Sequence, residues 1–174
     1  TTLSASQLQV IADPLLTQDI IVSPAVVSAG QNITVRMHIT NSGASEAQGV
    51  VPAALSKLGN GNYTYVSGPV PVSQTVAAGA NTYFTWIYQS SGAGSLAVNG
   101  YATGYSQYSK ATVTAVAEDS NFITIQSPAS LSSSISVPAT KNIGQWFTVT
   151  MTVTNNGTAT ADAVAPPSNL TVVG

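Results

Sequence analysis

Alternation of apolar and polar residues is the dominant pattern of this chain. It is clearest from residue 33 to residue 40, where every second side chain is apolar, which is the period of a strand buried on one face. A similar strand is expected from Asn81 to Gln89, with Phe84, Trp86 and Tyr88 on one side, most simply as core residues. The first strand has apolar Ile33, Val35, Met37 and Ile39 between polar Thr34, Arg36, His38 and Thr40.

Further short strands follow from the same pattern. They are expected at residues 48–53 and 70–76 and around Leu96, Val98 and Val113, separated by turns rich in Gly, Ser, Asn and Ala. No segment of useful length has the period of a helix. The chain is therefore predicted to be all-β, built from antiparallel immunoglobulin-like sandwiches.

An internal repeat sets the predicted domain organisation. The segment GQNITVRMHITNSG from Gly30 aligns with GQWFTVTMTVTNNG from Gly144, an offset of 144 − 30 = 114 residues with eight of 14 positions identical. The copy predicts a strand over residues 147–154, with Val149, Met151 and Val153 buried, and a second strand near residues 162–166. We therefore expect one sandwich over residues 1–118 and a partial second one over residues 119–174.

The second copy contains no counterpart of the strand with Trp86, so its core is predicted to be open on one side. An uncovered apolar face and free strand edges are liabilities in a soluble protein. Three interpretations follow: the sequence is cut from a longer repeat array, strands of another subunit complete the second copy, or the second copy is a smaller, divergent fold. For the second interpretation, the expected donor is the segment 4–12, in which Leu8 and Val10 alternate with glutamines.

The repeat segments resemble the CARDB-like (cell-adhesion-related) immunoglobulin-like domains of bacterial and archaeal surface proteins. The residues that carry the resemblance are SAGQNITVRMHITNSGASEAQGV and VAAGANTYFTWIYQSSGAGSLAVNGYATG, including Trp86. The resemblance implies an extracellular or cell-surface location. It is specific for the fold and says little about activity, because such modules serve as spacers, adhesins and polymer subunits alike.

Charge and composition narrow the function further. Charged residues are 6% of the chain, against about 25% in an average protein. The four Lys and Arg residues are scattered and the net charge is −2, which argues against a nucleic-acid partner. The apolar runs are too short for a membrane-spanning segment.

Catalytic chemistry is not predicted. The chain has no cysteine and a single histidine, His38, so neither a nucleophile with its base nor a histidine-based or thiolate metal site can be assembled. Glu118, Asp119 and Asn121 offer oxygen ligands for calcium, but they are too few and too widely spaced for a typical site, so the sequence favours a polar hinge between the two copies. We expect no catalytic residue, no cofactor and no metal.

Two sets of residues remain as candidate sites. Sequons for N-glycosylation predict possible glycans, although such triplets also arise by chance in a chain rich in Asn, Ser and Thr. Three tyrosines in GYATGYSQYSK are candidates for a protein interface or for stacking on sugars, or are ordinary edge residues. The sequons begin at Asn32, Asn62, Asn156 and Asn169, and the tyrosines are Tyr101, Tyr105 and Tyr108.

These observations predict a non-catalytic structural subunit of an extracellular filament, stalk or surface layer. Its expected partner is a second copy of itself, joined through β-strands, with intersubunit strand complementation as the mechanism. The alternative is an adhesive or carbohydrate-binding module of a larger secreted surface protein.

Overall fold

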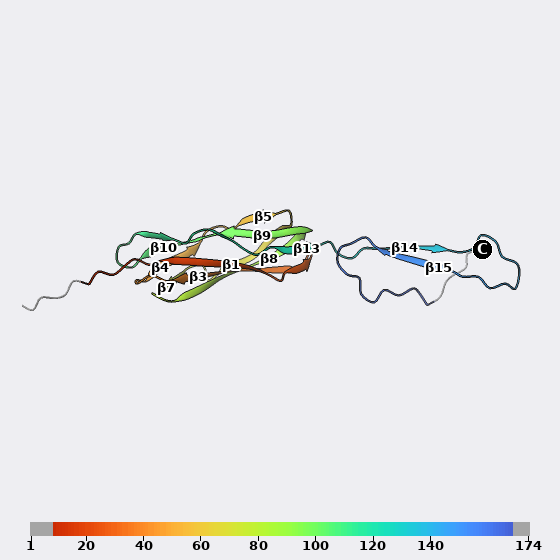
Figure 1. Cartoon of the computed structure of the whole chain (residues 1–174), viewed down its shortest axis with the longest axis horizontal. Coiled ribbons are helices and arrows are strands. Elements are labelled where there is room, and N and C mark those ends of the chain that lie inside the picture. Colours follow the sequence, from red (N-terminus) through yellow and green to blue (C-terminus); the bar gives the residue numbers. More distant parts are fainter. Residues whose placement is uncertain (1–8, 169–174) are drawn as a thin grey trace, which may run out of the picture. The chain divides into compact units, whose positions relative to one another are not determined.

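The computed structural model describes residues 9–168 and divides the chain into two compact units, residues 1–125 and 126–174 (Figure 1). All regular structure in the described residues is β-strand, as predicted. Unit 1 contains β1 (Leu16–Ser23), β2 (Val26–Ser28), β3 (Asn32–Asn41), β4 (Ala47–Pro52), β5 (Ser56–Gly59), β6 (Asn62–Val70), β7 (Gln74–Val76), β8 (Asn81–Gly92), β9 (Gly94–Gly100), β10 (Ala102–Ser106), β11 (Thr112–Thr114) and β12 (Glu118–Asp119). The strand β13 (Ile123–Gln126) ends unit 1, and unit 2 contains β14 (Leu131–Ser136) and β15 (Thr150–Asn155).

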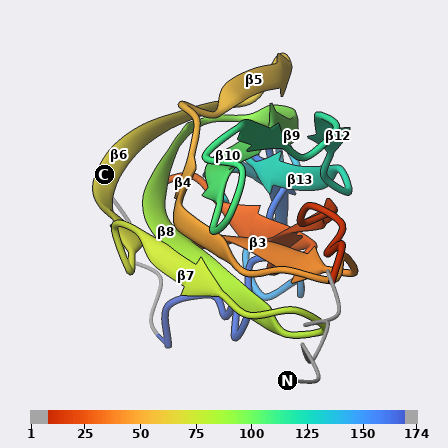
Figure 2. The same cartoon turned by 90° about the vertical axis from the view of Figure 1, so that its left-hand side faces the viewer.

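Unit 1 is an antiparallel sandwich. One layer is the sheet β1-β3-β8-β6. The other layer consists of the sheet β11-β10-β4-β7 and the sheet β12-β9-β13-β2, to which β5 is added by pairing with β9. The two sheets are joined where β9 continues into β10. Figure 2 shows β6 and β8 curving around the side of the unit opposite β9 and β13. Two antiparallel layers around one core, with no helix, make this an immunoglobulin-like β-sandwich.

The core of unit 1 confirms the predicted faces. Val35, Met37 and Ile39 on β3 are fully buried, whereas Arg36 between them is exposed. The neighbouring strand β8 buries Phe84, Trp86 and Tyr88 against them. Both layers contribute to a single apolar cluster, which includes Val50 on β4, Leu96 on β9, Ala102 on β10 and Ile125 on β13.

The boundary between the units differs from the predicted one. It lies between Ile125 and Gln126 rather than between residues 118 and 119. The reason is that β12 and β13 both pair with β9, and Ile123 and Ile125 are buried in the core of unit 1. Residues 119–125 therefore complete the first sandwich and do not begin the second copy.

Unit 2 is not a second sandwich in the described residues. Its only sheet there is the antiparallel pair β14-β15. The strand predicted over residues 147–154 is shorter, beginning at Thr150, and the strand predicted near residues 162–166 is irregular chain. In unit 1 the counterpart of that second strand is β4, which is held between β10 and β7. Unit 2 shows no equivalents of β7 and β10 in its described part, so this segment has nothing to pair with.

Candidate functional site

The strand pair of unit 2 repeats the pairing of β1 with β3 residue for residue. In unit 1, Ile20 lies opposite Met37, and in unit 2, Ile135 lies opposite Met151. Leu16 pairs with Asn41 in unit 1, and Leu131 pairs with Asn155 in unit 2. The offset from β1 to β14 is therefore 131 − 16 = 115 residues, and the offset from β3 to β15 is 155 − 41 = 114 residues. The sequences LTQDIIV from Leu16 and LSSSISV from Leu131 share their Leu, Ile and Val.

A side-chain-stabilised corner at the end of each second strand is also repeated. In unit 1, Oδ1 of Asn41 accepts hydrogen bonds from the backbone N–H groups of Leu15 (3.2 Å) and Gly43 (3.0 Å), and Nδ2 donates to the carbonyl of Ser45 (2.8 Å). In unit 2, Oδ1 of Asn155 accepts from Ser130 (3.1 Å) and Gly157 (3.0 Å), and its Nδ2 donates to Ala159 (2.8 Å). The same three bonds thus fix the path of both corners.

The turn before each second strand is a third shared feature. Gly30 and Gly144 both have a positive φ, 93° and 84°, a conformation that glycine adopts without steric cost. The next residue closes the turn in each case, because the N–H of Gln31 donates to Ser28 (3.1 Å) and that of Gln145 donates to Asn142 (3.2 Å). Turn, strand pair and corner together show that unit 2 begins to fold like unit 1.

The two units differ in how far these strands are buried. Leu16, Ile20 and Val22 are 4%, 2% and 2% exposed, whereas their counterparts Leu131, Ile135 and Val137 are 48%, 57% and 56% exposed. Val149 and Val153 are likewise exposed and Met151 is only partly buried, so the predicted burial of these residues is wrong for the isolated chain. We call this surface the open face. It consists of Leu131, Ile135, Val137, Val149, Met151 and Val153.

Aromatic and aliphatic side chains next to the open face are also in solvent. Trp146 is 97% exposed, Phe147 is 57% exposed, and Ile143 in the preceding turn is fully exposed. Phe147 aligns with Ile33, which is buried in unit 1. A set of apolar side chains this large on one hairpin is typical of an interaction surface.

The predicted glycosylation sites have the exposure that a glycan requires. Asn32, Asn62 and Asn156 are all exposed, and Asn169 lies outside the described residues. Asn62 accepts a hydrogen bond from Nζ of Lys57 (2.7 Å), and Nδ2 of Asn156 donates to Oγ of Ser132 (3.1 Å). Their use as glycan acceptors stays a prediction.

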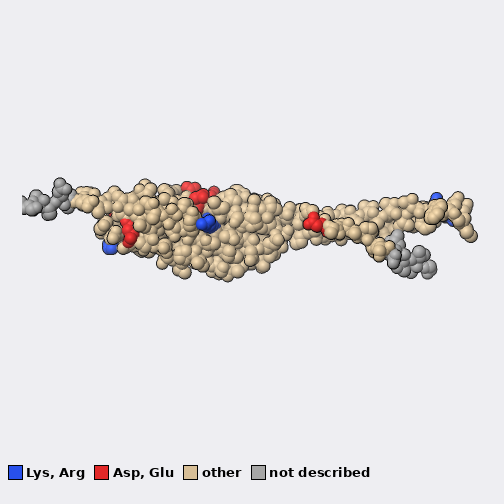
Figure 3. Space-filling model, turned by 90° about the horizontal axis from the view of Figure 1, so that it is seen from below, with Lys and Arg blue, Asp and Glu red and all other residues tan. Residues whose placement is uncertain are grey.

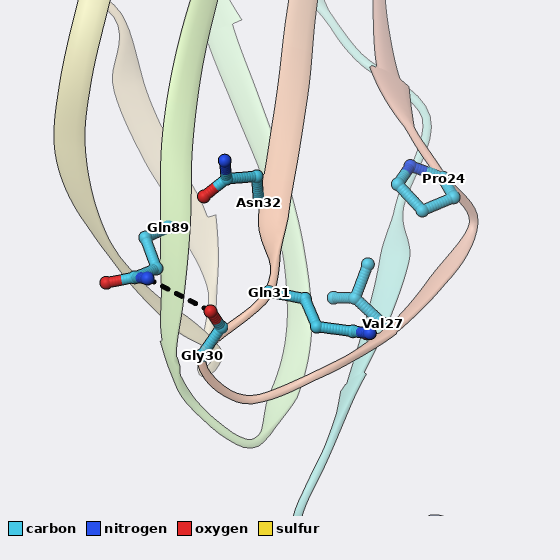
Figure 4. A pocket seen from close by; sticks show the side chains of 6 residues that line it. All are labelled: Pro24, Val27, Gly30, Gln31, Asn32 and Gln89. Atoms are coloured by element: carbon cyan, nitrogen blue, oxygen red, sulfur yellow. Dashed lines mark hydrogen bonds between the residues drawn. The ribbon is translucent and has the colours of Figure 1, made fainter.

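A shallow hollow of about 540 Å³ adjoins the first of these sequons (Figure 4). One wall is closed by Gln89, whose Nε2 donates to the carbonyl of Gly30 (3.0 Å). The residues around the hollow are uncharged. They are Pro24, Val27, Gly30, Gln31, Asn32 and Gln89.

The three candidate tyrosines lie in unit 1. Tyr101 connects β9 to β10, Tyr105 is on β10, and Tyr108 follows in the next turn, and all three side chains are exposed. The ring contacts found in the described residues involve other tyrosines. Tyr88 contacts Tyr63 and Tyr65 edge to face, at 4.6 and 5.9 Å between ring centroids.

The remaining polar candidates have structural partners. His38 stacks on Tyr83 at 4.4 Å between ring centroids, and the Arg36 guanidinium lies 3.7 Å above the same ring. Asn121 bonds both backbone groups of Val22, and Asp119 accepts a bond from Asn99. In residues 9–168 no three His, Cys, Asp or Glu side chains gather as a metal site would require.

Charge is sparse on the surface as a whole. Figure 3 shows single acidic and basic residues on an otherwise uncharged face. The open face itself contains no charged side chain, so no like-charge repulsion opposes its contact with another apolar strand. The described residues also include no helix of the length and apolarity that a membrane crossing needs.

Comparisons with known proteins find similarity to solved structures, two of which are described here. A scan of family models and a search of curated proteins both find no match. The CARDB domain of the PF1109 protein from Pyrococcus furiosus, crystallised with di-metal ions, is 15% identical, with a TM-score of 0.39 over 67% of this chain and 97% of that chain. The PapD-like domain 7 of human CEP192 is 11% identical, with a TM-score of 0.38 over 74% of this chain and 94% of that chain.

Proposed function

We propose that this chain is a non-catalytic structural subunit of an extracellular filament, stalk or surface layer, and that its copies associate through the open face of unit 2. The observation that carries the proposal is the contrast between two copies of one strand pair. The buried copy stabilises a sandwich, and the exposed copy presents the same apolar side chains to solvent.

The energetics favour association. Each apolar side chain of this size contributes about 1.5–3 kcal/mol when it is fully buried. Burying several residues of the open face would therefore gain free energy comparable to the whole stability of a domain, which is about 5–15 kcal/mol. A surface of this kind, repeated on every copy, supports growth into an extended assembly when the contact on the second copy lies elsewhere on the chain.

Electron microscopy of the purified full chain tests the proposal. We expect regular filaments or sheets that form above a threshold concentration. Assembly can be followed by light scattering and by sedimentation, and both signals should rise only above the threshold concentration.

A matched pair of variants identifies the surface. Val153 and Thr152 are neighbours on β15, both exposed, but they face opposite sides of the strand. Val153→Asp should abolish assembly, whereas Thr152→Asp should leave it in place. Filaments that form equally well with Val153→Asp would refute association through the open face.

The exposed tyrosines support a second candidate, an adhesive or carbohydrate-binding module. Tyr101, Tyr105 and Tyr108 lie in solvent on one short stretch of unit 1, and exposed aromatic rings stack on sugars. Such a module would remain monomeric and retain glycans on an array. Loss of that retention in Tyr105→Ala and Tyr108→Ala variants, without loss of folding, would favour this function over the filament.

A further inference from the structure

One edge of β15 is unpaired among the described residues. β14 occupies its other edge, in the register of β1 on β3. In unit 1 the corresponding free edge of β3 is covered by β8, with Val35 opposite Trp86 and Met37 opposite Phe84. Because unit 2 repeats the pairing of unit 1, β8 shows where an added strand belongs, in which direction it runs and which residues it must place inward.

The required strand has a definite pattern. Its inward residues lie opposite Phe147, Val149, Met151 and Val153, the counterparts of Ile33, Val35, Met37 and Ile39. In β8 these inward positions are Tyr88, Trp86, Phe84 and Thr82, which gives three apolar residues in alternation, preceded by a small polar one. The outward positions of β8 are Tyr83, Thr85 and Ile87.

We propose that residues 6–12 of a second copy form this strand, antiparallel to β15, with Leu8 opposite Met151 and Val10 opposite Val149. The proposal rests on the proposed function and specifies the contact by which it operates. SQLQVIA at residues 6–12 matches TYFTWIY at residues 82–88 in polarity at every position except the outward one where Gln7 stands for Tyr83.

Side-chain size is complementary at one pair of this register, Ala12 opposite Phe147. Unit 1 places the small Ile33 opposite the large Tyr88. In the proposed contact the larger Phe147 replaces Ile33, and the smaller Ala12 replaces Tyr88. The larger side chain thus moves from the added strand to the strand of unit 2, and the total volume of the pair changes little, which a closely packed interior tolerates best.

The described part of the donor segment has no strand partner in the chain. Residues 9–12 form no strand, and Val10 is 87% exposed. Residues 6–12 contain no charge, and neither does β15, so nothing at this edge resists pairing. Pairing would also extend β15 back over Phe147 and Val149, as β3 extends to Asn32 beside β8.

Disulfide trapping between copies tests the register. The chain has no cysteine, so introduced cysteines can pair only with each other. Gln9 and Thr150 correspond to Thr85 and Arg36, an outward pair on β8 and β3. Antiparallel partners have Cα atoms about 4.5–5.5 Å apart, within the range that a disulfide bridges.

A Gln9→Cys chain is mixed with a Thr150→Cys chain, allowed to assemble and oxidised, and the cross-linked peptides are identified by mass spectrometry. We expect the 9–150 disulfide in roughly tenfold excess over the product from a Thr152→Cys partner, because Thr152 lies opposite Gln7, two residues away from Gln9. Ser134→Cys on β14 serves as the control on the wrong edge and should give no product.

The outcomes separate this inference from the proposed function. Filaments without the 9–150 product would overturn the donor assignment and leave the filament standing. A dominant 9–152 product would overturn the register. In a chain that carries both Gln9→Cys and Thr150→Cys, a 9–150 disulfide formed within one monomer would overturn the assignment of the donor to a second copy. A chain that never assembles would overturn the proposed function itself.

Discussion

The strand pairs β1-β3 and β14-β15 share turn, register and corner, yet one lies in a core and the other in solvent. This contrast separates two contributions to the fold. Local pairing is determined by the alternating pattern and by the asparagine corner, which both copies contain. Burial comes from β8 and from the second layer, which the described part of unit 2 lacks. A paired hairpin is therefore no evidence of a closed core.

The largest expected difference between the units concerns their methionines. Met37 is fully buried and Met151 is partly exposed at the equivalent position. Met37→Ala should lower the free energy of unfolding of unit 1 by about 2–5 kcal/mol, because it leaves a cavity in a packed core. Met151→Ala should change the stability of the unassembled chain by less than about 1 kcal/mol.

Urea unfolding below the assembly concentration provides the measurement, with the emission of buried Trp86 reporting on unit 1 and the methyl NMR resonances of Ile135 reporting on unit 2. Equal losses in the two variants would mean that Met151 is already covered in the single chain. In assembled material, Met151→Ala should instead raise the concentration needed for assembly.

The asparagine corners give the next largest effect. Asn41 is fully buried and also donates to the carbonyl of Val76 (3.0 Å), whereas Asn155 is exposed. Asn41→Ala leaves several buried backbone groups unpaired and should cost about 2–4 kcal/mol. Asn155→Ala should cost about 1 kcal/mol or less, since water can satisfy the same groups. Thermal unfolding of both variants checks this, and a larger loss for Asn155→Ala would contradict it.

The sequence predicted the parts of the fold in which alternation is strong. The strand with Met37 and the strand with Trp86 follow from their patterns, because both are buried on one face only. β1 was missed because Gln18, a polar residue half-buried at an inward position, interrupts its pattern. Its copy β14 was missed because the offset from β1 to β14 is 115 residues, one more than the 114 residues that relate the rest of the repeat.

Exposed and edge strands were harder to predict. β6 is a sheet edge with few buried side chains, so its sequence carries almost no alternation. The unit boundary was placed too early because Ile123 and Ile125 are too short a pattern to show which core they join. For the open face, the repeat predicted that Val149, Met151 and Val153 share one side of a strand, but only the structure shows that β14 adds Leu131 and Ile135 to the same face.

A smaller effect is expected at high pH, and it concerns unit 1. Burial, with the nearby Tyr63 and Tyr65, raises the pKa of Tyr88 to about 12, and burial also raises the pKa of Tyr63. An unfolded tyrosine loses its proton near pH 10. The folded state therefore keeps protons that the unfolded state releases, and stability should fall as the pH rises from about 10 to about 12.

Melting temperatures across this range test the effect, and Tyr88→Phe should flatten the decline. The same scan sharpens the comparison, because all seven tyrosines precede residue 109. Unit 2 should show no tyrosine-linked loss, and a parallel loss of the folded Ile135 methyl resonances would contradict that expectation.

The smallest effect is expected in acid. The hydroxyl groups of Ser106 (2.6 Å) and Ser109 (2.7 Å) donate to Oδ1 of Asp13 and lower the pKa of this carboxyl group. A lowered folded-state pKa stabilises the protein above the ordinary carboxyl pKa, and this contribution is lost as the pH falls through the lowered value. Asp13 is exposed and the chain has only six acidic residues, so melting temperatures should stay nearly level from about pH 8 to about pH 4 and decline slightly below. Ser109→Ala removes one donor from the exposed side and should reduce even that decline, whereas a collapse of the fold near pH 4 would show that a carboxylate elsewhere has a larger structural role.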